Sequence, residues 1–306
     1  MTSHASGSLC TVMESNTRHI RWQAEPELTN PVIVIAFTGW NDAGDAASTA
    51  VRTLIETSGA DALADIDPEA FTDFATVRPH VRLDEQQRRN IVWPTVGVWS
   101  ASLPGSDVIF VLGPEPALRW KSFASQIVGI AEKYSSPLVI SLGALLADVP
   151  HTRPVHVFGS AADDDLISRF DLERSRYEGP TGIVGVVQHA LTSAGFSGAS
   201  LWAAVPGYAA QVPSPKAAVA LIERASGMMG TPAPTGGLNA DIDDYDARIE
   251  ALISDDDDLV IHIEQLESIV DDINDDDDTS GPIDLSESDD LLNEVEQFLR
   301  ERDNEN

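Results

Sequence analysis

The feature that most constrains the fold of this chain is a repeating order of apolar strand, glycine- or proline-rich turn, and helix. Each strand is a short run of consecutive apolar residues, a pattern typical of strands that are buried on both faces of a sheet. The order occurs four times, with strands at 31–37, 107–112, 137–141 and 199–205 and helices at about 43–57, 117–134, 183–194 and 215–224. We therefore predict an α/β fold with a mostly parallel sheet and helices on both of its faces.

Two further segments add to this sheet. Residues 77–99 alternate in polarity and are rich in Val, Thr and Trp, so they predict a β-hairpin that supplies one antiparallel member. Pro94 lacks an N–H group, which restricts its part of the hairpin to an edge strand or a bend. A short strand is predicted at 155–158. We expect Gly59 to end the first helix and Gly143 to end the third strand.

Acidic residues are concentrated toward the C-terminal end. The chain has 306 residues, with 19 Lys and Arg residues against 50 Asp and Glu residues and a formal net charge of -31. Residues 231–306 contain 26 of the acids and only 3 bases. A chain without a basic stripe is not expected to track a nucleic-acid backbone, and an acidic chain is repelled by anionic lipid surfaces. We therefore expect neither nucleic acid nor a membrane as a partner.

Composition predicts three regions in a cytoplasmic protein. We expect a flexible segment at 1–19, an α/β domain at 20–230, and a linker with an acidic helical region at 231–306, because all six tryptophans precede residue 231. The first 19 residues lack the basic and apolar parts of a secretory signal, and no apolar run approaches the roughly 18 residues of a membrane span. The single Cys10 excludes an internal disulfide and a thiolate metal cluster.

The acidic region has a helical pattern of its own. From 242 to 273 apolar residues recur at alternating intervals of three and four, a register broken only at Asp256. This pattern predicts one long amphipathic helix or a hairpin of two helices turning at 255–258. Either form must bury its apolar stripe against the body, a partner chain or itself. Residues 276–287 have the oxygen ligands, glycine and final Glu of a calcium loop, although a solvated acidic spacer explains the same residues. A last amphipathic segment lies at 291–299.

The loops after the strands carry the candidate functional residues, because open α/β sheets bind ligands at the carboxyl ends of their strands. Trp40, Asn41 and Asp42 lie in the first of these loops, between Gly39 and Gly44. They could contact a ligand or a partner. Alternatively, Asn41 or Asp42 caps the following helix and Trp40 packs on the sheet edge.

The second loop places Glu115 between Pro114 and Pro116. A carboxylate between two rigid neighbours can act as a general base or as a hydrogen-bond acceptor. Alternatively, Glu115 is an acid that is stabilised by the dipole of the helix predicted to begin directly after it. Trp120 follows on the next predicted helix, where core packing is the simpler interpretation.

Two more segments complete the candidate set. Residues 179–182 open a helix and could present backbone N–H groups to an anion, which makes Gly179 and Thr181 candidates. Tyr208 follows the strand at 199–205. The predicted ligand- or partner-binding residues are therefore Trp40, Asn41, Asp42, Glu115, Trp120, Gly179, Thr181 and Tyr208. Nucleotide fingerprints, a GxSxG elbow and metal-ligand histidine spacings do not occur in the sequence, so we predict no catalytic residue, no metal and no cofactor.

Four motifs follow one another in an order that resembles a known family. They are PVIVIAFTGWNDAG at 31–44, GPEPALRW at 113–120, YEGPTGI at 177–183 and LWAAVPGYAAQVPSPKAA at 201–218. In this order they resemble the signatures of the proteasome assembly chaperone 2 family, and more narrowly those of its actinobacterial-type members. The resemblance extends from about residue 20 to about residue 272.

The resemblance implies a three-layer α/β/α sandwich of the phosphorylase/hydrolase-like kind with an acidic C-terminal helical hairpin. Eukaryotic relatives chaperone assembly of the proteasome α-ring, and archaeal relatives form homo-oligomers that bind the proteasome core. We therefore expect a non-enzymatic assembly chaperone with protein partners, the proteasome among them, and a homo-oligomer of three or more copies. The alternative is an enzyme or nucleotide-binding protein, phosphorylase- or ligase-like, with Glu115 and Asp42 at the polar centre of its strand-end cleft.

Overall fold

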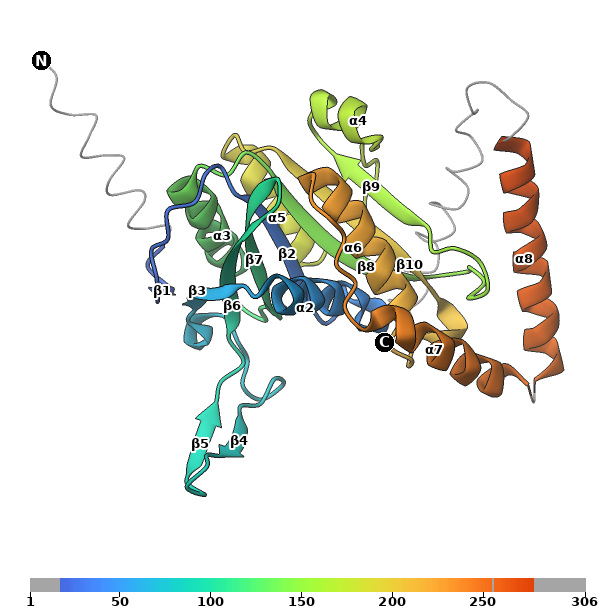
Figure 1. Ribbon diagram of the computed structural model, residues 1–306, viewed down its shortest axis with the longest axis horizontal. Helices are drawn as coiled ribbons and strands as arrows, with labels where there is room; N and C mark the ends of the chain where they lie inside the picture. Colours follow the sequence, from blue (N-terminus) through green and yellow to red (C-terminus); the bar gives the residue numbers. More distant parts are fainter. Residues whose placement is uncertain (1–16, 255, 278–306) are drawn as a thin grey trace, which may run out of the picture.

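The structure is a computed structural model that describes residues 17–254 and 256–277 (Figure 1). One large sheet runs through it and separates two layers of helices. In spatial order the strands are β1 (Ile20–Trp22), β3 (Asp61–Ile66), β6 (Val96–Leu103), β7 (Ser106–Pro114), β2 (Val32–Thr38), β8 (Val139–Ala147), β10 (Gly198–Pro206) and β9 (Val157–Ala161). The predicted α/β class is confirmed.

The parallel part of the sheet consists of β7, β2, β8 and β10. The strands β1, β3 and β6 continue it antiparallel at one side, and β9 does so at the other. The prediction of one antiparallel member is therefore wrong. The predicted hairpin is a separate two-stranded sheet of β4 (His80–Leu83) and β5 (Arg89–Val92), and Pro94 separates it from β6. Because Pro94 breaks the alternating run, only its last residues join the main sheet.

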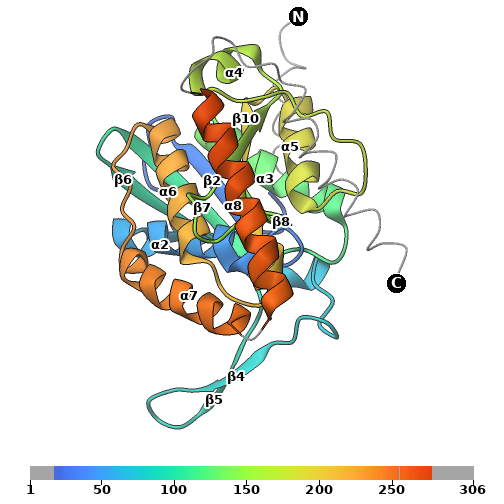
Figure 2. The same cartoon turned by 90° about the vertical axis from the view of Figure 1, so that its right-hand side faces the viewer.

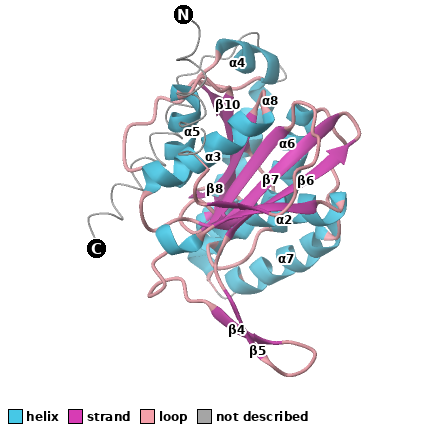
Figure 3. Ribbon diagram, turned by 90° about the vertical axis from the view of Figure 1, so that its left-hand side faces the viewer, coloured by secondary structure: helices cyan, strands magenta, loops and turns pink. Residues whose placement is uncertain are grey.

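Alternate residues of β2 supply two different cores, as the period of two in a strand requires. Ile33, Ile35 and Phe37 pack with helices α3 (Trp120–Tyr134) and α5 (Ile183–Ser193). Val34 and Ala36 pack with α2 (Ala46–Ser58) and α6 (Pro215–Met229) on the opposite face. The uninterrupted apolar run of β2 thus follows from burial on both faces, and the three-layer α/β/α sandwich is confirmed (Figure 3).

The structure confirms the predicted end of one helix and contradicts the predicted end of one strand. Helix α2 ends at Gly59, which has the left-handed φ of 61° that favours glycine. The prediction that Gly143 ends the third strand is wrong, because β8 continues to Ala147. A Cβ at Gly143 would lie 2.6 Å from Cε3 of Trp202 on the neighbouring strand. Gly143 therefore makes room for a tryptophan ring and does not form a turn.

The remaining elements are short. A helix α4 (Asp164–Phe170) follows β9, and single helical turns lie at η1 (Ala43–Asp45), η2 (Pro68–Ala70) and η3 (Gly207–Ala209). Asp163 caps α4 by accepting hydrogen bonds from the backbone N–H groups of Asp165 and Leu166.

The acidic region forms two helices, α7 (Leu238–Ile253) and α8 (Asp257–Asp277), and not one long helix. Helix α7 buries Tyr245 and Ile249 against the segment that follows β10. Helix α8 turns away from α7 and buries Ile263 and Leu266 (Figure 2). Residues 278–287 of the predicted calcium loop, the segment 291–299 and Cys10 lie outside the described residues.

Candidate functional site

The carboxyl ends of the four parallel strands meet at one edge of the sheet. In the register of β2 and β7, Thr38 lies beside Pro114, and in that of β8 and β10, Ala147 lies beside Pro206. The loops that follow these residues therefore share an edge, as the sequence predicts. Their side chains form two separate clusters along it.

The first cluster is built around Glu115. Its Oε1 accepts hydrogen bonds from Nδ2 of Asn41 at 3.0 Å and from the backbone N–H of Ile183 at 2.9 Å. Ile183 is the first residue of α5, where the helix dipole favours a negative charge. The helix start that we expected to present N–H groups to an anion thus receives the carboxylate of Glu115. Glu115 joins the loops after β7 and β2 to the start of α5.

Asn41 is buried in this cluster, where it contacts Ala144 and Gly182 as well as Glu115. Its backbone carbonyl accepts a hydrogen bond from the N–H of Ala144 on β8 at 2.8 Å. Its side chain lies against Gly182, where a Cβ would come within 2.3 Å of Oδ1. A glycine at 182 is therefore needed for this close approach. Among the described residues, no hydrogen-bond partner lies within reach of Asn41 Oδ1.

Asp42 binds the first turn of the following helix, which is one of the two roles that the sequence allows for it. Its Oδ1 accepts a hydrogen bond from the backbone N–H of Ser48 in the first turn of α2, at 3.0 Å. The side chain is buried, and burial raises the pKa of the Asp42 carboxyl above its ordinary value. The carboxylate is thus directed into the start of a helix.

The other candidates of this edge lie around Glu115 and Asn41. Trp40 is 46% exposed, so a large part of its ring faces solvent. Gly179 and Thr181 are exposed in the loop before α5. Trp120 is half-buried against the core of α3 and α5, and its Nε1 donates a hydrogen bond to the carbonyl of Pro116. The first cluster therefore has a buried polar centre and an exposed rim that includes Trp40.

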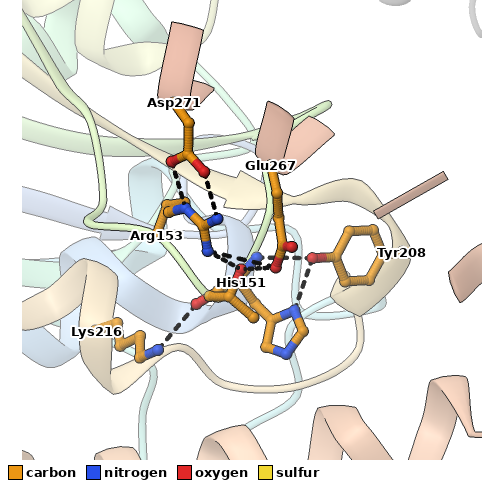
Figure 4. A network of polar contacts seen from close by, with 7 residues as sticks. His151, Arg153, Tyr208, Lys216, Glu267 and Asp271 are labelled. Atoms are coloured by element: carbon orange, nitrogen blue, oxygen red, sulfur yellow. Dashed lines mark hydrogen bonds and ion pairs between the residues drawn. The ribbon is translucent and has the colours of Figure 1, made fainter. Parts of the chain in front are cut away.

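Tyr208 belongs to the second cluster, at the ends of β8 and β10 (Figure 4). Its hydroxyl accepts a hydrogen bond from the backbone N–H of His151 at 2.7 Å and lies 2.9 Å from His151 Nδ1. Lys216 Nζ donates to the carbonyl of His151 at 2.9 Å and pairs with Asp246 of α7 at 2.7 Å. Burial raises the pKa of Tyr208 to about 12 and lowers the pKa of His151. The expected single cleft is thus two clusters, because β8 lies between β2 and β10.

Helix α8 is tied to the same loop by an arginine. Nε and Nη2 of Arg153 each lie 2.7 Å from a carboxylate oxygen of Asp271, and Nη1 lies 3.5 Å from Glu267 (Figure 4). Because these side chains are exposed to solvent, which screens their charges, the pairs contribute little to the stability of the contact. The pairs fix the position of α8 more than they add to its stability.

Sequence reasoning did not identify three residues of the second cluster: His151, Arg153 and Lys216. One signal was available for Lys216, which lies in the first turn of α6, where the helix dipole disfavours a cation. A lysine in that position needs nearby acceptors. His156, five residues after His151, is not part of this cluster, and its ring packs on Phe158 with the centroids 4.3 Å apart.

A hollow of about 240 Å³ lies over the antiparallel strands, away from both clusters, and is lined by residues that include Arg21, Asp65 and Trp99. A much smaller one, of about 10 Å³, is lined in part by Pro114 and Pro116, the two neighbours of Glu115. Within 17–254 and 256–277, no group of three or more His, Cys, Asp or Glu side chains is arranged to hold a metal ion. No helix in this part of the chain is long and apolar enough to cross a membrane.

This chain is similar in sequence and structure to several proteins of known structure. A PAC2 family protein from Streptomyces avermitilis is 44% identical over 76% of this chain and 99% of its own, with a TM-score of 0.72. A Mycobacterium tuberculosis proteasome-assembly chaperone homologue is 40% identical over the same shares, with a TM-score of 0.69. An archaeal proteasome activator of Pyrococcus furiosus is 16% identical over 76% of this chain and 97% of its own, with a TM-score of 0.62, and shows a shared fold alone.

No curated protein matches the sequence of this chain. A family match nevertheless covers residues 36–253, which include both clusters and helix α7. This range contains most of the segments whose motifs suggested the resemblance. The chain therefore belongs to the PAC2 family.

Proposed function

We propose that this chain is a non-enzymatic assembly chaperone whose partners are proteasome subunits. The observation that carries the proposal is the 40% identity to a protein described as a proteasome-assembly chaperone homologue, over 99% of that protein's length. The clusters described above support a binding role over a catalytic one. Glu115 Oε1 is bonded to two donors of the fold, and Asp42 is directed into the start of α2.

The rim of the first cluster is the proposed partner face. Trp40 is 46% exposed and Leu118, after β7, is 50% exposed at the same edge of the sheet. Aromatic residues are enriched in the cores of protein interfaces, where a tryptophan is often among the few side chains that supply most of the binding energy. Thr181, also exposed, would contribute a polar contact to this face. The buried Asn41–Glu115 hydrogen bond holds the loops that present these side chains.

The test uses purified proteasome α-subunits as the probe. We expect the chain to co-elute with them, and Trp40→Ala to weaken this association by about 2 kcal/mol or more, the loss typical of a central interface tryptophan. Trp93→Ala is the matched control, because Trp93 is also 46% exposed but lies in the connection from β5 to β6, outside the first cluster. Failure of the unsubstituted chain to associate with the subunits or with the assembled core would overturn the proposal.

A second experiment addresses the enzyme alternative. Thermal unfolding is followed with a panel of nucleotides and nucleosides, since a ligand at 100 times its Kd would stabilise the chain by about 2.7 kcal/mol. We expect no stabilisation by any of them. A stabilisation that Glu115→Ala abolishes would instead favour a small-molecule site at the first cluster.

A further inference from the structure

Two cations lie beside the proposed partner face. Arg119 and Lys121 follow Leu118 at the start of α3, where Arg119 is the N-cap and Lys121 is the second helical residue, and both are exposed. Within 17–254 and 256–277, neither side chain makes an ion pair or a hydrogen bond, although the chain has 50 acids. Other cations do pair with acids, among them Arg21, Arg88, Lys133, Arg153 and Arg174. Two positive charges are therefore available at this edge of the sheet.

Lys121 occupies a position that is unfavourable for its own helix. The N-terminal end of a helix carries a partial positive charge, so a cation in the first turn is repelled. On α6, Lys216 occupies the same second position, but it pairs with Asp246 and donates to the carbonyl of His151. Lys121 has no such acceptor in the described part of the chain. Because a local rule that is broken without compensation inside the fold is typical of a functional site, the acceptor of Lys121 is expected in a binding partner.

Exposed apolar side chains share this edge with the cations. Leu118 is 50% exposed and directly precedes Arg119, and Trp40 is 46% exposed in the loop after β2. The two loops are in contact, since a Cβ at Gly39 would lie 3.5 Å from Cβ of Glu115. Apolar and positively charged side chains are thus combined on one exposed surface. We call it the basic rim, and it consists of Trp40, Leu118, Arg119 and Lys121.

We propose that the basic rim binds an acidic segment of the partner, with carboxylates on its two cations and an apolar side chain against Trp40 and Leu118. This inference rests on the proposed function and names the chemistry of its partner. The net charge of -31 repels an acidic protein from most of this molecule, so a basic site directs where such a protein docks. The guanidinium of Arg119 can hold a carboxylate through two parallel hydrogen bonds, and the ammonium of Lys121 supplies a further charge. Tryptophan and arginine are also enriched among the interface residues that supply most of the binding energy.

Two probes test the inference on the full chain. The first is purified proteasome α-subunits, and the second is a labelled peptide of glutamates with a leucine at its centre, which depends on no proteasome sequence. We expect both to bind, and Arg119→Glu with Lys121→Glu to weaken each association at least about tenfold, mainly through a slower association rate. Arg119→Lys keeps the charge and should weaken binding much less. Added salt should weaken both associations of the unsubstituted chain and affect those of the charge-reversed variant far less.

Arg52→Glu with Arg248→Glu is the matched control. Both arginines are exposed on helices outside the basic rim, α2 and α7, and the double substitution changes the net charge by the same amount. It should weaken the two associations much less, because salt screens charges that are distant from the contact. Circular dichroism confirms that each variant is folded, which the exposure of all four substituted side chains favours.

The outcomes separate this inference from the proposed function. A peptide that does not bind the unsubstituted chain would overturn the inference even where the α-subunits associate, and so would a charge-reversed variant that binds as well as the control. A bound peptide without bound α-subunits would support the basic rim and contradict the proposed function alone. If Arg119→Glu with Lys121→Glu lowers the molar mass in light scattering but leaves the association with α-subunits unchanged, the basic rim contacts a second copy and the inference is wrong.

Discussion

At the scale of single residues, Glu115 shows how a candidate catalytic acid serves the fold. Replacing it with alanine leaves the amide of Asn41 and the backbone N–H of Ile183 without their acceptor. We expect Glu115→Ala to lower the free energy of unfolding by about 1–3 kcal/mol, the cost of unsatisfied buried donors. Glu115→Gln should lose less, because the amide oxygen still accepts. Urea unfolding measures both.

Glu56→Ala, on the exposed face of α2, is the control and should unfold at nearly the same urea concentration as the unsubstituted chain. Equal stability of Glu115→Ala and Glu56→Ala would contradict the role given to Glu115. It would also return Glu115 to the list of groups free to act on a ligand.

His151 makes a pH dependence predictable. Burial lowers the pKa of His151 below 6.5, so the unfolded chain takes up this proton at a higher pH than the folded chain does. Between 6.5 and the lowered value the unfolded state binds more protons, and stability therefore falls as the pH falls through that window. We expect the urea midpoint to drop between pH 7.5 and pH 5.5, and His151→Gln to reduce this drop.

The drop should not vanish in His151→Gln, because burial also lowers the pKa of His19 and of His156. Tyr208→Phe separates the hydrogen bond from the titration. It removes the acceptor of the His151 N–H and should destabilise the chain at every pH. An unchanged pH dependence in His151→Gln would show that His151 does not titrate in the predicted window.

At the scale of elements, α7 is predicted to be held by few side chains. Ile249 is wholly buried with Tyr245, Ala209 and Val212, in a core separate from the two cores of the sheet. Ile249→Ala should weaken this packing by about 2–5 kcal/mol. Hydrogen exchange should then speed up in α7 and α8 but not in β2 or β8. Leu252→Ala is the control on the same helix, since Leu252 is 59% exposed and should change nothing.

The elements also show what the sequence could predict. The run at 31–37 predicted β2 because a strand buried on both faces has no polar alternation. By contrast, β3 contains two aspartates in six residues and gives no such signal, so the antiparallel side of the sheet was missed. The prediction for Gly143 was wrong because the sequence does not distinguish a glycine that ends a strand from one that makes room for a neighbouring ring, here that of Trp202.

The candidate site was predictable to a similar extent. The sequence identifies which residues follow each strand but not the order of strands in the sheet. Asn41 and Glu115 meet because β2 and β7 are neighbours, whereas Tyr208 is separated from them by β8. The partner of Tyr208 is His151, which lies in a loop, and Lys216 at the start of α6, which bonds to His151, gave a hint of it.

At the scale of the whole molecule, the charge of -31 makes the stability of the fold depend on salt. Carboxylates on α7 and α8 repel one another across a Debye length of about 30 Å at 0.01 M salt but only about 8 Å at 0.15 M. Salt should therefore raise the melting temperature of the chain by reducing self-repulsion.

Thermal unfolding of the chain, followed by circular dichroism at several concentrations of NaCl, tests this prediction. The melting temperature should rise steadily from about 0.01 M to about 0.15 M NaCl. A melting temperature that falls with salt would mean that attractive ion pairs, such as that of Arg153 with Asp271, outweigh the repulsion among the acids.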